Sequence, residues 1–336
     1  MKNTRVLISG ASIGGPAMAF WLHRYGFDVT VVEKADTIRA GGQAVDFKGP
    51  IHRTVLERMG ILDEVKAANV PNADGTIVNA QGRKIGTVPG EFAGGEINVP
   101  RGDLAGILYR LTADRVTYIF GDSISTLSET DSGIDVTFVS SQAQTFDLVI
   151  GADGMHSNVR ELAFGPESDY VHHLGYYYVL AGLDTGEDEM LYNEPGRMAA
   201  IGGTKAPAFF IFTSDVLPPA RDDVALQKQQ AVDALSGGRW RMPELVAKIP
   251  TPTSSTWTPS VAPRSITTAG GEWRSSATPP TETRSAGSGP ACLSWVPTSL
   301  PVSWPWRTAT TNAPSTPTRT GSATTPRSRR RSTPGG

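Results

Sequence analysis

The chain has 336 residues, with 31 basic and 33 acidic side chains and a net charge of −2. It is long enough for one large or two ordinary domains, and its charge gives no electrostatic case for binding nucleic acid or an anionic membrane. The single cysteine, Cys292, excludes an internal disulfide and a cysteine-rich metal site. The N-terminus is short and polar, and no apolar run approaches the roughly 20 residues of a membrane span, so we expect a cytoplasmic protein.

The chain opens with a β-α-β pattern. Residues 4–9 form a short apolar strand, a glycine-rich turn follows at 10–15, and an apolar helical stripe ends at Gly26. A second apolar strand, 29–32, is closed by Glu33. Such a turn brings the amides of a helix N-terminus against a pyrophosphate, so the pattern predicts a dinucleotide site.

Two details qualify this site. Ser12 occupies the middle position of the G-x-G-x-x-G pattern, where a small side chain still lets the backbone approach the phosphates at a slight steric cost. Glu33 lies 23 residues after Gly10, the spacing of a ligand for the ribose hydroxyls, and its charge would repel a 2′-phosphate. The alternative, an ordinary glycine-rich turn between a strand and a helix, leaves Glu33 unexplained.

The next hundred residues alternate between helical and strand patterns. Residues 38–50 are too rich in glycine for a regular element. The expected elements are a helix over 51–69, two strands within 75–88 that turn at Gln81-Gly82, a helix that follows Asn98–Leu104 and runs through Leu111, and strands at 116–120, 134–139 and 146–150, the last two around a polar turn at 140–145.

A second motif follows the strand at 146–150. Gly151-Ala152-Asp153-Gly154 ends this buried strand, and a helix begins after it. Ligands of open α/β sheets bind at the carboxyl ends of the strands. Asp153 is therefore expected either to accept a hydrogen bond from a cofactor hydroxyl or to cap the helix.

The two motifs together, G-A-S-I-G-G-P…V-V-E-K and D-L-V-I-G-A-D-G-M-H-S-N-V-R, resemble the flavin-dependent aromatic hydroxylases typified by p-hydroxybenzoate hydroxylase. The segments G-G-Q-A-V-D-F-K-G and N-V-P-R-G-D-L are most similar to the branch of tetracycline-inactivating monooxygenases and polyketide hydroxylases. The resemblance covers about residues 4–250. It implies an α/β fold in which a Rossmann-like FAD-binding domain with a parallel sheet (1–70 and 98–165) is interleaved with a substrate domain on a mixed or antiparallel sheet (71–97 and 166–250).

The resemblance also implies a function. FAD would be reduced by NADPH or NADH, O₂ would add at the flavin C4a position, and the hydroperoxide would hydroxylate an aromatic or polyketide-like small molecule. The sequence demands no acid–base catalyst and no metal, so none is named. The residues that the resemblance assigns to the cofactor are Gly10, Ser12, Ile13, Gly14, Glu33, Lys34, Gln43, Asp46, Arg101 and Asp153.

The expected substrate domain carries strands at 176–181 and 208–212 and an amphipathic helix at Val224–Leu235. Met190, Met198 and the aromatic residues of these strands either line an apolar cavity or form the core of the sheet. His172-His173 lacks a partner pattern for a metal and is expected to lie in a loop.

From Thr251 onward the composition changes. Residues 251–336 hold no Asp, Lys, His, Phe or Tyr, whereas five of the seven tryptophans fall there. Such a serine-, threonine- and proline-rich segment is expected to be largely irregular and disordered. It also lacks the Gly-Asp-Ala-Ala-(His/Tyr) motif that the resemblance requires after residue 250.

A change of reading frame restores this motif. In GC-rich DNA, codons built from the third base of one codon and the first two of the next turn Trp273–Thr281 into V-A-L-V-G-D-A-A-Y. Continued through Glu282–Pro305, the same rule gives a family-like glycine-rich helix. We hypothesise a frameshift near Ile249–Thr251, by mutation or by sequencing error.

Three alternatives stay open at this point. The first is another enzyme of the FAD fold, a halogenase or a reductase, although Trp304-Pro305-Trp306 only mimics the start of the halogenase signature. The second is an inactive, frame-shifted remnant of a hydroxylase. The third, a plain NAD dehydrogenase, is disfavoured because Arg101 occurs together with the Gly-Ala-Asp-Gly motif.

The frame hypothesis predicts that resequencing the gene across codons 245–255 will reveal an inserted or missing base. Where the shift is a sequencing error, the tail peptides will contain Gly-Asp-Ala-Ala, and where it is a mutation they will match the printed sequence. Mass spectrometry of the purified protein is the check. Tail peptides that match the printed sequence, from a gene with a single intact frame, would refute it.

Overall fold

This computed structural model describes residues 4–183, 185–186, 188–204, 208–217 and 223–249, and beyond them the backbone of three strands at 255–263, 273–275 and 291–294. All of these residues belong to one compact unit, Met1–Val302. No described helix is long and apolar enough to cross a membrane.

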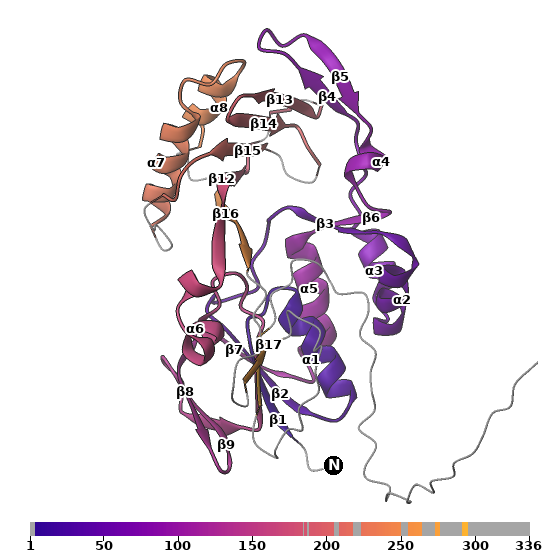
Figure 1. Ribbon diagram of the computed structural model, residues 1–336. Helices are drawn as coiled ribbons and strands as arrows, with labels where there is room; N and C mark the ends of the chain where they lie inside the picture. Colours follow the sequence, from indigo (N-terminus) through magenta and orange to yellow (C-terminus); the bar gives the residue numbers. More distant parts are fainter. Residues whose placement is uncertain are drawn as a thin grey trace, which may run out of the picture. The chain divides into compact units, whose positions relative to one another are not determined.

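A six-stranded parallel sheet carries the predicted dinucleotide site (Figure 1). Val6, Leu7 and Ile8 in its middle are fully buried, as expected for strands covered on both faces. The strands, in spatial order, are β17 (Trp273–Ser275), β18 (Ala291–Ser294), β11 (Leu148–Gly151), β1 (Arg5–Ser9), β2 (Asp28–Glu33) and β7 (Thr117–Phe120). The predicted opening β-α-β unit is confirmed as β1, α1 (Gly14–Arg24) and β2.

The helices beside this sheet differ from expectation in one place. Instead of a single helix over 51–69, the chain forms α2 (Gly49–Met59) and α3 (Leu62–Ala67). The break falls at Gly60, whose φ of 76° a continuous helix does not permit. The other helices of this part are α5 (Arg101–Thr112), which contacts α1, α6 (Asn158–Phe164), and the short α4 (Gly90–Ala93) and η1 (Glu167–Asp169).

The expectation that 38–50 holds no regular element was wrong. β3 (Ala44–Phe47) pairs antiparallel with β6 (Ile97–Pro100). The partner lies about fifty residues further along, so the local sequence of β3 carried no sign of it. Asn98 of β6 is buried, donates its amide N–H to Asn69 Oδ1 at 2.7 Å and accepts the Gly95 amide at 2.9 Å, which fixes the ribbon to its neighbouring loops.

A seven-stranded mixed sheet is the second large sheet of the unit, as the fold class predicted. Its strands, in spatial order, are β16 (Ser255–Pro263), β12 (Val171–Ala181), β15 (Ala208–Thr213), β14 (Arg197–Ile201), β13 (Met190–Glu194), β4 (Gly75–Val78) and β5 (Lys84–Val88). α7 (Val224–Leu235) and α8 (Met242–Ala247) pack on one face of it (Figure 1). His172 and His173 lie in β12 and not in a loop, because β12 extends to pair with β16, whose composition did not indicate a strand.

A three-stranded antiparallel sheet is formed by the part of the chain between β7 and β11. It contains β8 (Ile124–Thr130), β9 (Gly133–Phe138) and β10 (Gln144–Phe146). The expected strand at 146–150 is therefore two strands, β10 and β11, which belong to different sheets. Asp147 stands between them, and its carboxylate accepts the Arg5 amide at 2.7 Å.

Asp122 holds this small sheet to the end of β7. Its buried carboxylate accepts the amides of Ser123 at 2.8 Å, Ser140 at 3.0 Å and Ser141 at 2.8 Å. Burial alone would raise its pKa, but the hydrogen bonds from Ser141, Ser123 and Ser140 outweigh burial, and the pKa of Asp122 lies below its ordinary value. The ionised carboxylate is thus the form that the fold requires.

We expect Asp122→Asn to lower the free energy of unfolding at pH 7 by about 1–3 kcal/mol, because amides are left without an acceptor. Since the folded pKa is depressed, this contribution is complete above pH 3.8, the unfolded value, and is lost as pH falls through the folded pKa. Urea unfolding of both proteins at several pH values measures it. Asp131→Asn, at an exposed turn residue, is the control. An equal loss in both variants would contradict the role of Asp122.

Candidate functional site

The glycine-rich turn lies where three backbone segments touch. Gly10 has a φ of 105°, and its amide donates to the Val32 carbonyl at 2.7 Å. A Cβ on Gly10 would lie 2.5 Å from the Ala152 carbonyl oxygen, and one on Gly15 would lie 1.8 Å from the Gly10 oxygen. No side chain fits at either position, so the backbone at the end of β1 stays bare.

The N-terminus of α1 begins directly at this turn. Its N-cap, Ile13, makes no capping hydrogen bond through its side chain, and the first turn holds no acidic residue. Gly14 opens the helix and adds no side chain. The first amides of a helix need acceptors and carry partial positive charge, so this end can receive a phosphate group.

Glu33 reaches the turn from the end of β2. Its side chain is only 14 % exposed. One carboxylate oxygen accepts the Ala11 amide at 2.8 Å and the other accepts the Ala35 amide at 2.9 Å. Each oxygen keeps a further lone pair, so the held carboxylate can also accept two hydroxyl groups. The structure therefore places Glu33 beside the turn, and its role as a ribose ligand stays a prediction.

Arg101 begins α5 and also lies at the turn. Its amide donates to the Gln43 carbonyl at 3.3 Å, and its guanidinium donates to Ser12 Oγ at 3.4 Å. Although the residue is partly exposed, desolvation lowers the pKa of the Arg101 guanidinium, and Tyr178 on β12 opposes this shift. No local pattern in the sequence indicated that Tyr178 affects this group.

The remaining candidates after β2 lie at the surface. Lys34, Gln43 and Asp46 are exposed. Gln43 precedes β3, and Asp46 lies within it, opposite Asn98 of β6. The structure thus places these two side chains on the β3–β6 ribbon, with Gln43 joined through its carbonyl to Arg101.

Asp153 follows β11 and binds protein groups on both oxygens. Oδ1 accepts the Ser157 hydroxyl at 2.5 Å, and Oδ2 accepts the Val159 amide at 3.1 Å and the Ser9 hydroxyl at 3.3 Å. Burial raises the pKa of Asp153, while the bonds from Ser157 and Val159 oppose the rise. Ser157, the N-cap of α6, in turn accepts the Arg160 amide. The carboxylate therefore serves the start of α6, which was one of its two expected roles.

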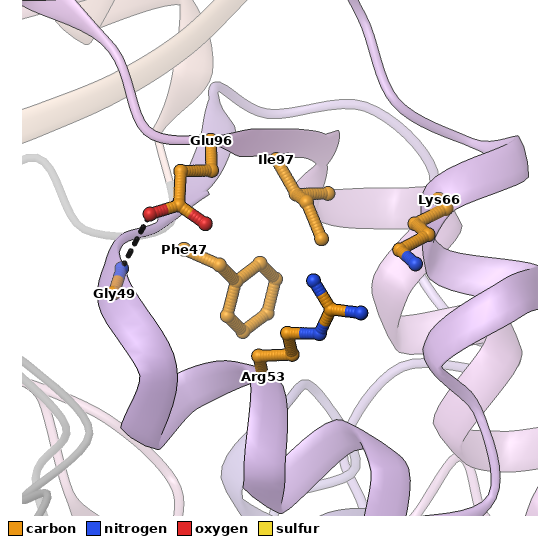
Figure 2. Close-up of a pocket in the computed structure, with 6 residues that line it drawn as sticks. All are labelled: Phe47, Gly49, Arg53, Lys66, Glu96 and Ile97. Atoms are coloured by element: carbon orange, nitrogen blue, oxygen red, sulfur yellow. Dashed lines mark hydrogen bonds between the residues drawn. The ribbon is translucent and has the colours of Figure 1, made fainter.

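A separate cavity of about 200 Å³ lies beside the β3–β6 ribbon and α2, lined by Phe47, Gly49, Arg53, Lys66, Glu96 and Ile97 (Figure 2). Glu96 accepts the Gly49 amide there at 3.3 Å. None of the ten candidate cofactor residues lines it. Among the described residues, no group of three side chains could hold a metal ion.

Comparison with known proteins identifies the family. Residues 3–204 match the model of the FAD binding domain. A flavin-dependent monooxygenase of Legionella longbeachae is 30 % identical over 261 residues, which cover 74 % of this chain and 67 % of that protein. An uncharacterized protein of Mycobacterium tuberculosis is 45 % identical over 182 residues, or 51 % of this chain, and the match spans about half (47 %) of that relative's length.

A solved structure agrees with these matches. The crystal structure of tetracycline destructase Tet(55) superposes with a TM-score of 0.64 at 32 % identity, covering 74 % of this chain and 66 % of that one. The fold described above is thus shared with a protein of related sequence. This chain belongs to the FAD binding domain family, and FAD is the cofactor for which its fold is built.

Proposed function

We propose that this chain binds FAD across the Gly10 turn and that the intact protein is a monooxygenase, which uses NADPH or NADH and O₂ to hydroxylate an aromatic or polyketide-like small molecule. The observation that carries the proposal is the convergence of three features at one point. The bare backbone at Gly10, the uncapped start of α1 and the held carboxylate of Glu33 suit a pyrophosphate with its ribose.

The residues present fit the cofactor. The amides of Ile13, Gly14 and their neighbours would bind the pyrophosphate, and Glu33 would accept the adenosine ribose hydroxyls. Arg101 would hold negative charge on the same side. Gln43 and Asp46 would lie along the flavin side, Lys34 beside the ribose, and Asp153 would position the β11–α6 junction. When bound, FAD supplies the oxygen-activating redox chemistry.

The seven-stranded sheet offers a surface for the substrate. Tyr177, Phe210 and Phe212 are buried under α7 and α8, and Met190 packs with this core. The alternate residues face the other way and stay half-buried: Tyr178, Leu180, Met198, Phe209 and Ile211. Tyr178 and Met198 are each register partners of Ile211, so this second face is continuous and apolar. Tyr178 on this face has an electrostatic effect on the pKa of Arg101 at the turn. We therefore propose that the substrate binds along this face.

An inactive remnant is the second candidate, because the expected Gly-Asp-Ala-Ala motif is absent from residues 251–336. β17 and β18 extend the parallel sheet beyond β11. The segments between and after them, where the motif belongs, lie outside the described residues.

The proposal predicts a yellow protein. Full-length protein, purified with added FAD and freed of excess, should show flavin absorbance near full occupancy and oxidise NADPH or NADH in the presence of O₂. Absorbance spectra and nicotinamide fluorescence measure both. A flavin spectrum without NAD(P)H oxidation would support an FAD-binding remnant. A folded, colourless protein that takes up no FAD would overturn the proposal.

Glu33→Gln should weaken FAD binding by about tenfold, because a neutral amide is a poorer acceptor for the ribose hydroxyls and for the Ala11 and Ala35 amides. Fluorescence titration of apoprotein with FAD gives the dissociation constant. Glu91→Gln, at an exposed residue of α4, is the matched control and should bind FAD like the wild type. Unchanged binding in Glu33→Gln would remove Glu33 from the site.

A further inference from the structure

Ser12 is the one residue of the turn that departs from the glycine pattern, and it is also the acceptor for Arg101. The guanidinium Nη2 lies 3.4 Å from Ser12 Oγ, across 89 residues of sequence. A glycine at position 12 could not make this contact. The departure from the pattern therefore adds a hydrogen-bonding group to the turn.

The Arg101 side chain passes Gly42 and ends in a hydrogen bond to Ser12. The side chain runs along Gly42, where an added Cβ would lie 3.4 Å from both Cβ and Cδ of Arg101. Its backbone is fixed by the Gln43 carbonyl and by the start of α5. Within the described residues, no carboxylate pairs with the guanidinium, and Ser12 is its one side-chain partner. Among the described side chains, no carboxylate therefore balances the charge of Arg101 at the turn.

We propose that Ser12 is a positioning residue whose hydroxyl holds the Arg101 guanidinium beside the N-terminus of α1, so that both face the same anionic group. This inference rests on the proposed function, in which that group is the FAD pyrophosphate. Arginine carries many rotamers, and holding it in place beforehand reduces the entropy lost when the cofactor binds. The hydroxyl thus strengthens binding through Arg101.

Two readings of Ser12 predict opposite results for Ser12→Gly. If Ser12 only obstructs the phosphates, glycine relieves the obstruction and FAD binds more tightly. If Ser12 holds Arg101, glycine and alanine both release the guanidinium, and FAD binds about fivefold more weakly. Fluorescence titration of the full-length apoprotein with FAD distinguishes them. Ser128→Ala, at an exposed residue of β8, is the matched control.

A double-mutant cycle tests whether Ser12 acts through Arg101. In an Arg101→Gln background, Ser12→Ala should change the FAD dissociation constant by less than about twofold, because the residue it positions is gone. An undiminished fivefold loss there, or tighter binding by Ser12→Gly, would overturn the inference. Far-UV circular dichroism and thermal melting of each variant confirm that the fold is retained.

A measurement without FAD separates this inference from the proposed function. Phenylglyoxal modification of Arg101 in the apoprotein, followed by peptide mass spectrometry, should be about threefold faster in Ser12→Ala than in the wild type, because the guanidinium has lost its partner. Equal rates would overturn the inference even if FAD binds. Faster modification of Ser12→Ala in a protein that binds no FAD would support the hydrogen bond between Ser12 and Arg101. The same result would contradict the proposed function.

Discussion

Close backbone packing at Gly10 is the constraint on which the site depends. The turn after β1 touches Ala152 after β11 and bonds to Val32 at the end of β2, and Gly15 brings α1 down onto Gly10. Three strand ends and one helix are thereby fixed within contact distance. The amides of α1, the carboxylate of Glu33 and the carboxylate of Asp153 all take their positions from this junction, so a side chain at Gly10 or Gly15 would disturb every one of them.

The parts of this arrangement that the sequence predicted are those governed by neighbouring residues. β1, α1 and β2 follow from an apolar run, a glycine turn and a helical stripe within thirty residues, and helix Val224–Leu235 follows from its own periodicity. Glu33 could be placed because β2 runs parallel to β1 and ends beside the turn that follows β1. The two-sheet fold came from the resemblance, which joined motifs that no local pattern connects.

The parts that could not be predicted depend on partners far along the chain. β3 exists because β6 pairs with it, and His172 lies in a strand because β16 extends beside it. The hydrogen bond between Arg101 and Ser12, and the electrostatic effect of Tyr178 on the pKa of Arg101, arise between residues far apart in the sequence. Asp153 shows the same limit: its motif indicated either a cofactor ligand or a cap, and its hydrogen bond from Ser9, 144 residues away, could not be predicted from that motif.

The C-terminal strands protect the edges of the two large sheets. β18 pairs with the side of β11 that β1 leaves open, and β16 pairs with the side of β12 that β15 leaves open, so these two strands close one border of each large sheet. β16 carries Pro259 and Pro263 on this outer position, where proline hinders the addition of another strand. Loss of these segments by proteolysis would bare the hydrogen-bonding groups of β11 and β12 together. Two exposed, apolar borders on one molecule would permit chains to join edge to edge, which makes self-association the expected fate of a truncated protein.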